Sequence, residues 1–279
     1  MPRYKYRILD PSGNVTALVI GLVHDADVRC CIQDAILEKH KNVEQVGFVC
    51  EDTSAPQLFM TGGEFCGNAT RAAAWHYLEG KPGELSLWVS GVDAEVRAGV
   101  SANLDAWAAV PVRIDIKKVR RLGEGIFFVK MEGIAHMVLA ERQAKEYLRR
   151  LDADSLEDKE RLKWYAKALL ERYSLFDRDA CGVMFCENVL DMVKIHPCLF
   201  INTAGTAYYE MACGSGSIAV ALVAAYLRGS AVNLPILQPS DKIIHTSIEF
   251  CDGEACGARI SGGVADSGEV LEVEADAQC

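Results

Sequence analysis

Two cysteines are each followed directly by glycine and then by an alanine-rich segment. The first is Cys66, within Phe65–Thr70, and the second is Cys213, within Ala212–Ser217. Since alanine favours the helix, each thiol is expected at a helix N-terminus. Unsatisfied backbone N–H groups and the positive end of the helix dipole meet there, and both favour a thiolate. The pKa of each cysteine is therefore expected to fall.

The match between the two segments continues along the chain. When the alignment of the two segments is shifted by two residues, Tyr77–Gly80 corresponds to Tyr226–Gly229. A strand-like run follows in both places, at Leu85–Val89 and at Leu234–Gln238. The pattern predicts two related halves, each of which places one thiol at the start of a helix.

The same helix starts suit an anion such as a substrate carboxylate. Gly67 and Gly214 would let that anion approach the backbone closely. Two such units around one pocket fit the inversion of an amino-acid α-carbon, in which one group removes the α-proton and another returns a proton on the opposite face. N–H groups that hold the carboxylate would stabilise the developing negative charge. This chemistry needs no metal and no pyridoxal phosphate in principle.

Two other interpretations of the paired cysteines remain open. Both could be core residues of a duplicated structural motif, because unpaired cysteine is commonly buried. Both could also form a redox pair, although redox pairs usually lie close together as CxxC. The chain has eleven cysteines, an odd number, which does not indicate a disulfide framework. No paired CxxC or histidine spacing typical of a metal site occurs, so no metal is expected.

The composition excludes several classes of partner. The formal net charge of −10 argues against nucleic acid and anionic membranes. Hydrophobic residues make up 50% of the chain and charged residues 24%, which suits a globular core. No leader-like segment and no run of about 18 apolar residues is present. The expectation is a cytoplasmic protein with a small-molecule partner.

Hydrophobic periodicity predicts mixed helices and strands, an α/β (α+β) chain. Helical spacing runs over Ala26–Lys39 and over Lys145–Arg172, and the second segment is expected to break near Ala153. Separate strands are predicted at 192–195 and 199–202.

The chain is expected to form two domains that join near residues 117–121. The N-terminal lobe, 1–118, carries Cys66 and is completed by a terminal strand from 264–279. The C-terminal lobe, 119–263, carries Cys213. The charged helical region in the second lobe could carry a homodimer contact.

The motifs also resemble the diaminopimelate epimerase superfamily of cofactor-independent racemases and epimerases. The matching segments are Pro11–Asn14, Phe65–Ala69, Val89–Gly91 and Ala212–Gly216. They occur in order over nearly the whole chain. The resemblance implies two pseudo-symmetric lobes, each a mixed curled sheet around a central helix, with the active site between them.

The resemblance also implies a set of site residues. Its members are Cys66 and Cys213 as the two bases, Gly67, Asn68, Gly214 and Ser215 as ligands of the α-carboxylate, Asn14 as a residue that helps close the site, and His136 as an assistant to one thiol. The two sulfurs are expected to flank a single carbon, so that oxidation to a disulfide would inactivate the protein.

Departures from the epimerase pattern bear on the substrate. The segment before Cys213, Thr203–Ala207, lacks the Glu and Arg that hold the distal end of diaminopimelate. Three asparagine positions of the family are Met60, Ile134 and Ala180 here. A distal carboxylate would therefore be poorly paired in a desolvated pocket, and diaminopimelate is disfavoured.

The sequence of these motifs resembles the histidine racemase branch of the superfamily more than the epimerase branch. Histidine racemases supply D-histidine for opine-type metallophores. The segments that carry this likeness are Pro11–Thr16, Glu44–Phe48, Glu64–Thr70 and Gln238–Pro239. An imidazole needs an acceptor for its N–H and an apolar wall. Glu44 and Glu210 are the candidate acceptors, and Tyr208 or Phe65 the candidate wall. An epimerase of diaminopimelate or hydroxyproline type, or an inactive amino-acid-binding protein, remains the alternative.

Overall fold

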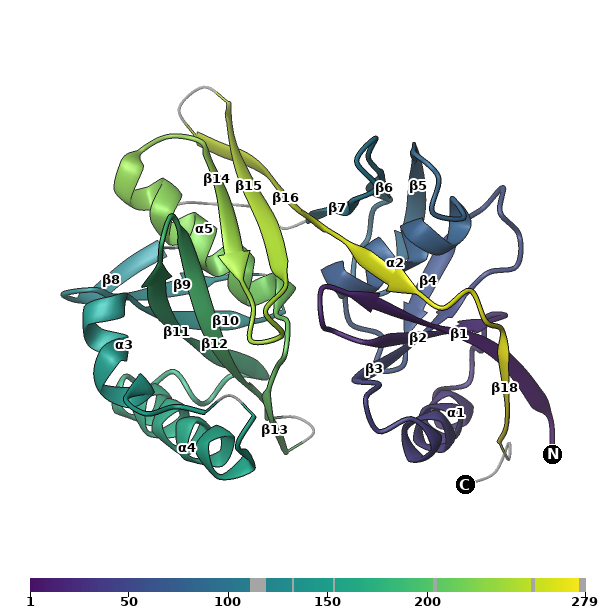
Figure 1. Ribbon diagram of the computed structural model, residues 1–279, viewed down its shortest axis with the longest axis horizontal. Coiled ribbons are helices and arrows are strands. Elements are labelled where there is room, and N and C mark those ends of the chain that lie inside the picture. The colour runs from purple at the N-terminus through teal and green to yellow at the C-terminus, as the bar shows by residue number, and fades with distance from the viewer. Residues whose placement is uncertain (111–118, 132, 153, 203–204, 252–253, 276–279) are drawn as a thin grey trace. The chain divides into compact units, whose positions relative to one another are not determined.

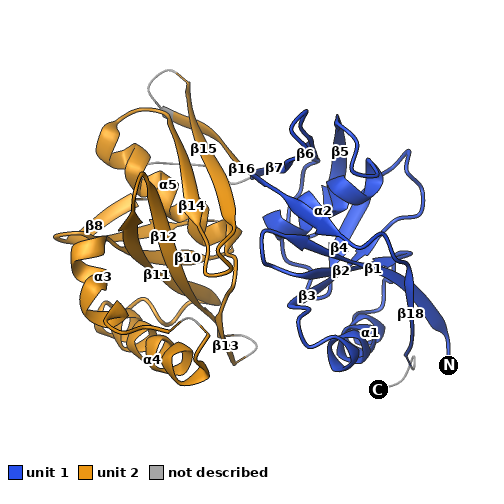
Figure 2. Cartoon of the chain, in the orientation of Figure 1, with its two compact units in different colours: residues 1–111, 261–279 blue, residues 112–260 orange. Residues whose placement is uncertain are grey.

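The computed structural model describes residues 1–110, 119–131, 133–152, 154–202, 205–251 and 254–275. The chain forms two compact units (Figure 2). Unit 1 is Met1–Pro111 with Ser261–Cys279, and unit 2 is Val112–Ile260. Of the lobe join predicted near residues 117–121, residues 117 and 118 lie outside the described residues.

Unit 1 is a mixed sheet with two helices (Figure 1). In chain order its elements are β1 (Arg3–Pro11), β2 (Thr16–Ile20), α1 (Ala26–Lys39), β3 (Gln45–Val49), β4 (Gln57–Met60), α2 (Gly67–Tyr77), β5 (Gly83–Val89), β6 (Val96–Val100), β7 (Ala106–Val110), β17 (Val264–Asp266) and β18 (Leu271–Glu274). β2 and β3 are parallel, as are β4 and β5. The pairs β1–β2, β3–β4, β5–β6 and β6–β7 are antiparallel. β17 and β18 also run antiparallel to β1, so the end of the chain completes this sheet.

Unit 2 has the same kind of sheet with three helices. Its elements are β8 (Val119–Gly123), β9 (Ile126–Lys130), β10 (Ala135–Leu139), α3 (Glu141–Leu148), α4 (Leu156–Arg172), β11 (Ala180–Val189), β12 (Met192–Ile201), β13 (Thr206–Tyr209), α5 (Gly214–Arg228), β14 (Val232–Leu237), β15 (Ile243–Cys251) and β16 (Glu254–Gly262), which ends in unit 1. β10 and β11 are parallel, as are β12 and β14. The pairs β8–β9, β9–β10, β11–β12, β12–β13 and β14–β15 are antiparallel.

The two units repeat one order of strand pairing. In each, an antiparallel pair leads to a parallel pair, another antiparallel pair and a second parallel pair. Helices connect the parallel strands, as crossover connections require. The helix of the second crossover, α2 in unit 1 and α5 in unit 2, packs against strands on several sides. α2 packs against β1, β2, β5, β6, β7 and β17, and α5 against β8, β9, β10, β11, β14 and β15. The predicted α/β (α+β) class, a duplicated mixed sheet curled around a central helix, is confirmed.

Small side chains explain why a helix can lie inside each sheet. Ala72, Ala73 and Ala74 of α2 are fully buried in the core of unit 1. Ala219 and Ala221 of α5 are fully buried in unit 2. Alanine combines the highest helix propensity with the smallest volume that still excludes water. The alanine-rich segments are therefore central helices, covered by strands rather than by solvent.

One strand prediction was wrong. β12 runs without a break through Pro197, where the sequence predicts two strands at 192–195 and 199–202. Proline lacks an N–H and is rare in the middle of a sheet. Here His196, Pro197 and Cys198 are opposite consecutive residues of β11, and burial of the strand holds it extended.

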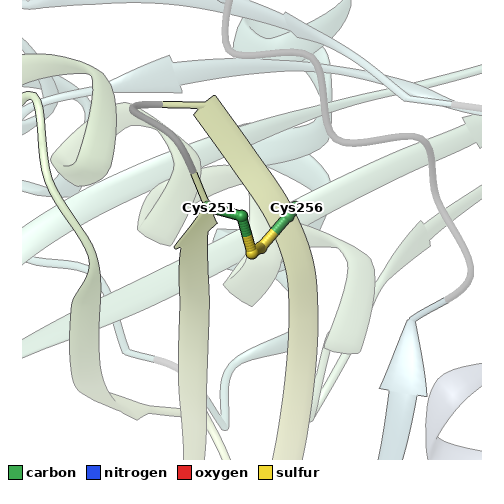
Figure 3. The surroundings of a disulfide bond; sticks show 2 residues. All are labelled: Cys251 and Cys256. Atoms are coloured by element: carbon green, nitrogen blue, oxygen red, sulfur yellow. A yellow bond between two sulfur atoms is a disulfide. The ribbon is translucent and has the colours of Figure 1, made fainter.

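The cysteines divide into thiols and disulfides. Cys251 and Cys256 form a disulfide between β15 and β16 (Figure 3), although the sequence pattern indicated no disulfide framework. Among the thiols, Cys181, Cys186 and Cys198 are buried in unit 2. Burial raises the pKa of the Cys186 thiol to about 12, which makes it an inert core residue. In the described part of the chain, no helix has both the length and the apolar composition needed to cross a bilayer.

Two leucines of α5 test the importance of the central helix. Leu222 is 4% exposed, whereas Leu227 is 61% exposed. Leu222→Ala should lower the free energy of unfolding by about 2–5 kcal/mol because it leaves a cavity. Leu227→Ala should change it by about 0.5 kcal/mol or less. Urea unfolding followed by circular dichroism measures both, and equal effects would contradict the central position of α5.

Candidate active site

Cys66 is the N-cap of α2. Its backbone is extended, with φ −129° and ψ 113°, and its sulfur accepts the Ala69 N–H at 3.4 Å. The thiol also donates to the Gln45 amide oxygen at 3.3 Å. The Thr70 N–H and hydroxyl both donate to the Cys66 carbonyl, at 2.9 and 2.7 Å. These bonds place the sulfur at the start of the helix, as the sequence predicts.

Gln45 links Cys66 to two further residues that the sequence analysis selected. The Gln45 amide nitrogen donates to Asn14 Oδ1 at 2.7 Å and to the Thr16 hydroxyl at 2.8 Å. The Asn14 amide nitrogen donates to Glu44 Oε2 at 2.6 Å. A continuous chain of hydrogen bonds therefore joins the Glu44 carboxylate to the Cys66 thiol. Gln45 itself was missed as a site residue.

Gly67 and Asn68 occupy the first two positions of α2. The backbone N–H groups of the first helical turn have no carbonyl acceptor within the helix. They therefore remain available at the helix N-terminus. The Asn68 side chain is buried, and its oxygen accepts from Arg71 Nη2 at 3.0 Å. The Arg71 contact leaves the orientation of the Asn68 amide well defined.

Cys213 repeats this geometry as the N-cap of α5. Its backbone angles are φ −118° and ψ 104°, and its sulfur accepts the Gly216 N–H at 3.2 Å. The Ser215 hydroxyl lies 3.5 Å from the same sulfur. The Ser217 N–H and hydroxyl donate to the Cys213 carbonyl at 3.0 and 2.6 Å, as Thr70 does for the first cysteine.

A buried glutamine also holds the second cysteine, but through the backbone. Gln238 Oε1 accepts the Cys213 N–H at 2.9 Å. Gln238 Nε2 donates to the Ser217 hydroxyl and to the Ile236 carbonyl, both at 3.0 Å. The sequence indicates Gln238 only as part of the Gln238–Pro239 motif, because no local pattern reveals which buried backbone group a glutamine will satisfy.

His136 lies fully buried on β10, with its Nε2 3.0 Å from the Ser215 hydroxyl. Burial lowers the pKa of His136 to about 3, so the ring is neutral. Within the described residues its Nδ1 has no hydrogen-bond partner. A buried N–H without an acceptor is costly, which favours the tautomer in which Nε2–H donates to Ser215. Ser215 can then donate to the Cys213 sulfur.

The electrostatics of Cys213 differ from the expectation drawn from the helix dipole. Burial raises the pKa of Cys213 well above its usual value, and the charge and hydrogen bond of Glu210 raise it further. Contacts with Ser215 and Gly216 lower it by less. Desolvation of the thiolate therefore outweighs the helix N-terminus, and Cys213 keeps its proton at neutral pH. The general prediction of a lowered pKa was wrong for this cysteine.

Each unit thus gathers its own subset of the predicted site residues. Unit 1 joins Cys66 with its neighbours Gly67, Asn68, Asn14 and Glu44, and unit 2 joins Cys213 with its neighbours Gly214, Ser215, His136 and Glu210. Phe65 packs partly buried against the core of unit 1, and Tyr208 is 50% exposed on β13. Residues 203–204 of the segment before Cys213 lie outside the described residues. In the described part of the chain, no three His, Cys, Asp or Glu side chains could hold a metal ion.

Comparison with known proteins identifies related sequences. The model of the family described as histidine racemase CntK N-terminal domain matches residues 4–269. A histidine racemase of Fusobacterium nucleatum subsp. nucleatum is 27% identical over 262 residues, which cover 88% of this chain and 90% of that protein. A histidine racemase of Staphylococcus aureus is 26% identical over 254 residues, which cover 85% of this chain and 86% of that protein.

Solved structures with the same fold are more distant in sequence. A hydroxyproline epimerase from Agrobacterium vitis with bound trans-4-hydroxy-L-proline has a TM-score of 0.61 and 13% identity, with coverage of 97% of this chain and 92% of that chain. Methylitaconate-delta-isomerase has a TM-score of 0.56 and 10% identity, with coverage of 98% and 96%. At these identities the likeness concerns the fold alone.

The influence of Glu210 on Cys213 can be measured directly. Glu210→Gln removes the negative charge that raises the pKa of Cys213, so the pH midpoint of Cys213 alkylation should move to lower pH. Iodoacetamide labelling followed by peptide mass spectrometry gives this midpoint. Glu171→Gln, at an exposed ion pair of α4, is the control and should leave the midpoint unchanged. A midpoint that stays constant in Glu210→Gln would show that Glu210 does not act on this thiol.

Proposed function

Since this chain belongs to the histidine racemase family whose model spans residues 4–269, we propose that it interconverts L- and D-histidine. The observation that carries the proposal is the pair of cysteines, Cys66 and Cys213, each at the N-cap of a central helix. A duplicated structural motif has no need of a thiol at that position in both copies. The redox alternative is disfavoured because each thiol is embedded in its own helix-cap network.

The proposed chemistry is proton transfer at the α-carbon between two thiols. One cysteine, as thiolate, removes the α-proton, and the other, as thiol, returns a proton on the opposite face. The raised pKa of Cys213 supports its presence as the protonated partner. The reaction conserves charge and electrons, because one sulfur gains the proton that the other loses. We propose that it requires no metal or cofactor.

The substrate carboxylate is proposed to bind at the two helix starts. Its ligands would be the first-turn groups of α2 and α5, namely Gly67, Asn68, Gly214 and Ser215. Backbone N–H groups there place positive potential where negative charge develops as the α-proton leaves. His136 would support Ser215 through their 3.0 Å contact. Asn14, which accepts a hydrogen bond from Gln45, would help close the site.

Two carboxylates are the proposed acceptors for the imidazole of the substrate. Glu210 lies beside Cys213, and Glu44 is joined to Cys66 through Asn14 and Gln45. Each of these two carboxylates is therefore joined to one of the proposed bases by hydrogen bonds. We further propose a cytoplasmic location and a place in the supply of D-histidine for metallophore synthesis.

Deuterium uptake tests the substrate assignment. Incubation with a panel of L-amino acids in heavy water should exchange the α-hydrogen of histidine and yield deuterated D-histidine. Proton NMR and chiral chromatography score the two products. Exchange of hydroxyproline or diaminopimelate in place of histidine would assign the chain to another epimerase, and exchange of no amino acid would favour an inactive binding protein.

Serine substitutions test the two-thiol mechanism. Cys66→Ser and Cys213→Ser should each lower the rate of histidine racemisation by at least about 100-fold, because a serine hydroxyl is a far weaker acid than a thiol and does not ionise near neutral pH to act as a base. Each variant should keep the circular dichroism spectrum of the parent. The exposed Cys30→Ser serves as control and should retain full activity. Turnover by Cys213→Ser at the parent rate would falsify the mechanism.

A further inference from the structure

The hydrogen bonds that lead from Glu44 to Cys66 have a fixed direction. An ionised carboxylate accepts hydrogen bonds and donates none. The Asn14 amide nitrogen, 2.6 Å from Glu44 Oε2, is therefore the donor of the first bond, which leaves Asn14 Oδ1 as the acceptor toward Gln45. Gln45 Nε2 lies 2.7 Å from Asn14 Oδ1 and donates to it. The carboxylate thus sets the orientation of both amides.

A second anchor sets the same orientation of Gln45. Thr16 is fully buried, and its hydroxyl donates its one proton to the Asn14 backbone carbonyl at 2.9 Å. Thr16 Oγ1 is then an acceptor toward Gln45, and it takes the second proton of Gln45 Nε2 at 2.8 Å. Both amide protons of Gln45 are used in these two bonds, so its oxygen is the atom that faces Cys66.

The contact between Gln45 and Cys66 depends on the proton of the sulfur. Cys66 Sγ lies 3.3 Å from Gln45 Oε1. Since an amide oxygen has no proton to give, this contact is a hydrogen bond only when the sulfur carries one. A thiolate in the same place would face the negative end of the carbonyl dipole. The contact therefore selects the thiol and points its S–H at Gln45.

We propose that Gln45 is a positioning residue that holds Cys66 as a thiol in the protein without substrate, with its amide oriented by Glu44 through Asn14 and by Thr16. The meaning of this state for catalysis rests on the proposed function. Because Cys213 also keeps its proton at neutral pH, the resting protein holds two thiols. Proton transfer across the α-carbon begins once one of the two sulfurs has released its proton to water.

Gln45 acts on its thiol without carrying a charge. Glu210 acts on Cys213 with a negative charge as well as a hydrogen bond, whereas Gln45 acts on Cys66 through one neutral hydrogen bond. Removal of Gln45 therefore changes no charge. The charged side chains around Cys66, its hydrogen-bond network and the buried arginine of α2 all remain, namely Glu44, Glu64, Arg71, Asp10 and Asp105.

Alkylation of the intact protein without substrate tests the proposal. Cys66 is partly exposed, so iodoacetamide reaches it. Peptide mass spectrometry gives the pH midpoint of its labelling, which reports ionisation of the sulfur, whereas access to the sulfur changes only the plateau rate. In the parent protein the midpoint of Cys66 should lie above neutral pH. A midpoint below neutral pH overturns the proposal without any variant.

Substitution of the glutamine then isolates its hydrogen bond. Gln45→Ala removes the acceptor and admits water, and both changes favour the thiolate. The Cys66 midpoint should fall by about half a unit to one unit, the effect of one ordinary hydrogen bond. Gln143→Ala, at another partly buried glutamine, on α3 of unit 2, is the matched control and should leave the midpoint unchanged. The buried Cys186 should stay unlabelled in each folded variant.

The outcomes separate this inference from the proposed function. A fall confined to Gln45→Ala supports the role of Gln45. A midpoint that stays constant in Gln45→Ala, or that falls equally in Gln143→Ala, overturns that role even if histidine is racemised. Both results stand whether or not the deuterium experiment assigns histidine as substrate.

Infrared spectroscopy of the parent protein decides the matter if labelling of Cys186 shows that Gln45→Ala has lost its fold. The S–H stretching band of Cys66 is the band that Cys66→Ser removes. Its presence at neutral pH supports the thiol, and its absence overturns the proposal.

Discussion

Each unit is built around a helix that is buried inside its own sheet. Alanine faces allow strands to approach α2 and α5 on several sides, so neither helix can slide along its axis without opening a cavity in the core. The residue at each N-terminus is consequently held by the packing of a whole unit. Cys66 and Cys213 occupy these two cap positions with nearly the same backbone angles.

The two cap positions share one backbone geometry and differ in their surroundings. Cys213 lies beside Glu210, whose charge and hydrogen bond raise the pKa of that thiol. Cys66 instead contacts Gln45, which links it to Asn14 and Thr16. The duplication preserves the backbone that holds each sulfur, and single side chains have diverged around it.

Features that depend on residues close in sequence were predictable. α1 occupies Ala26–Lys39 as predicted, because Asp25 caps its first turn and the apolar spacing is regular. The two cysteine caps followed from a thiol, a glycine and an alanine-rich run at the same spacing in both halves. These are local preferences of the backbone, repeated in sequence, and they identify the fold class and the two sulfurs.

The surroundings of the two sulfurs come from residues that the fold brings together. Arg71 reaches Pro11, Gln45 reaches Cys66, and Gln238 satisfies the Cys213 N–H, each across a long stretch of chain. The continuity of β12 through Pro197 likewise depends on its pairing with β11 and on its burial in the fold. A thiol's pKa depends on which charges approach it and how completely water is excluded. Sequence spacing specifies neither quantity, because both are properties of the packed core.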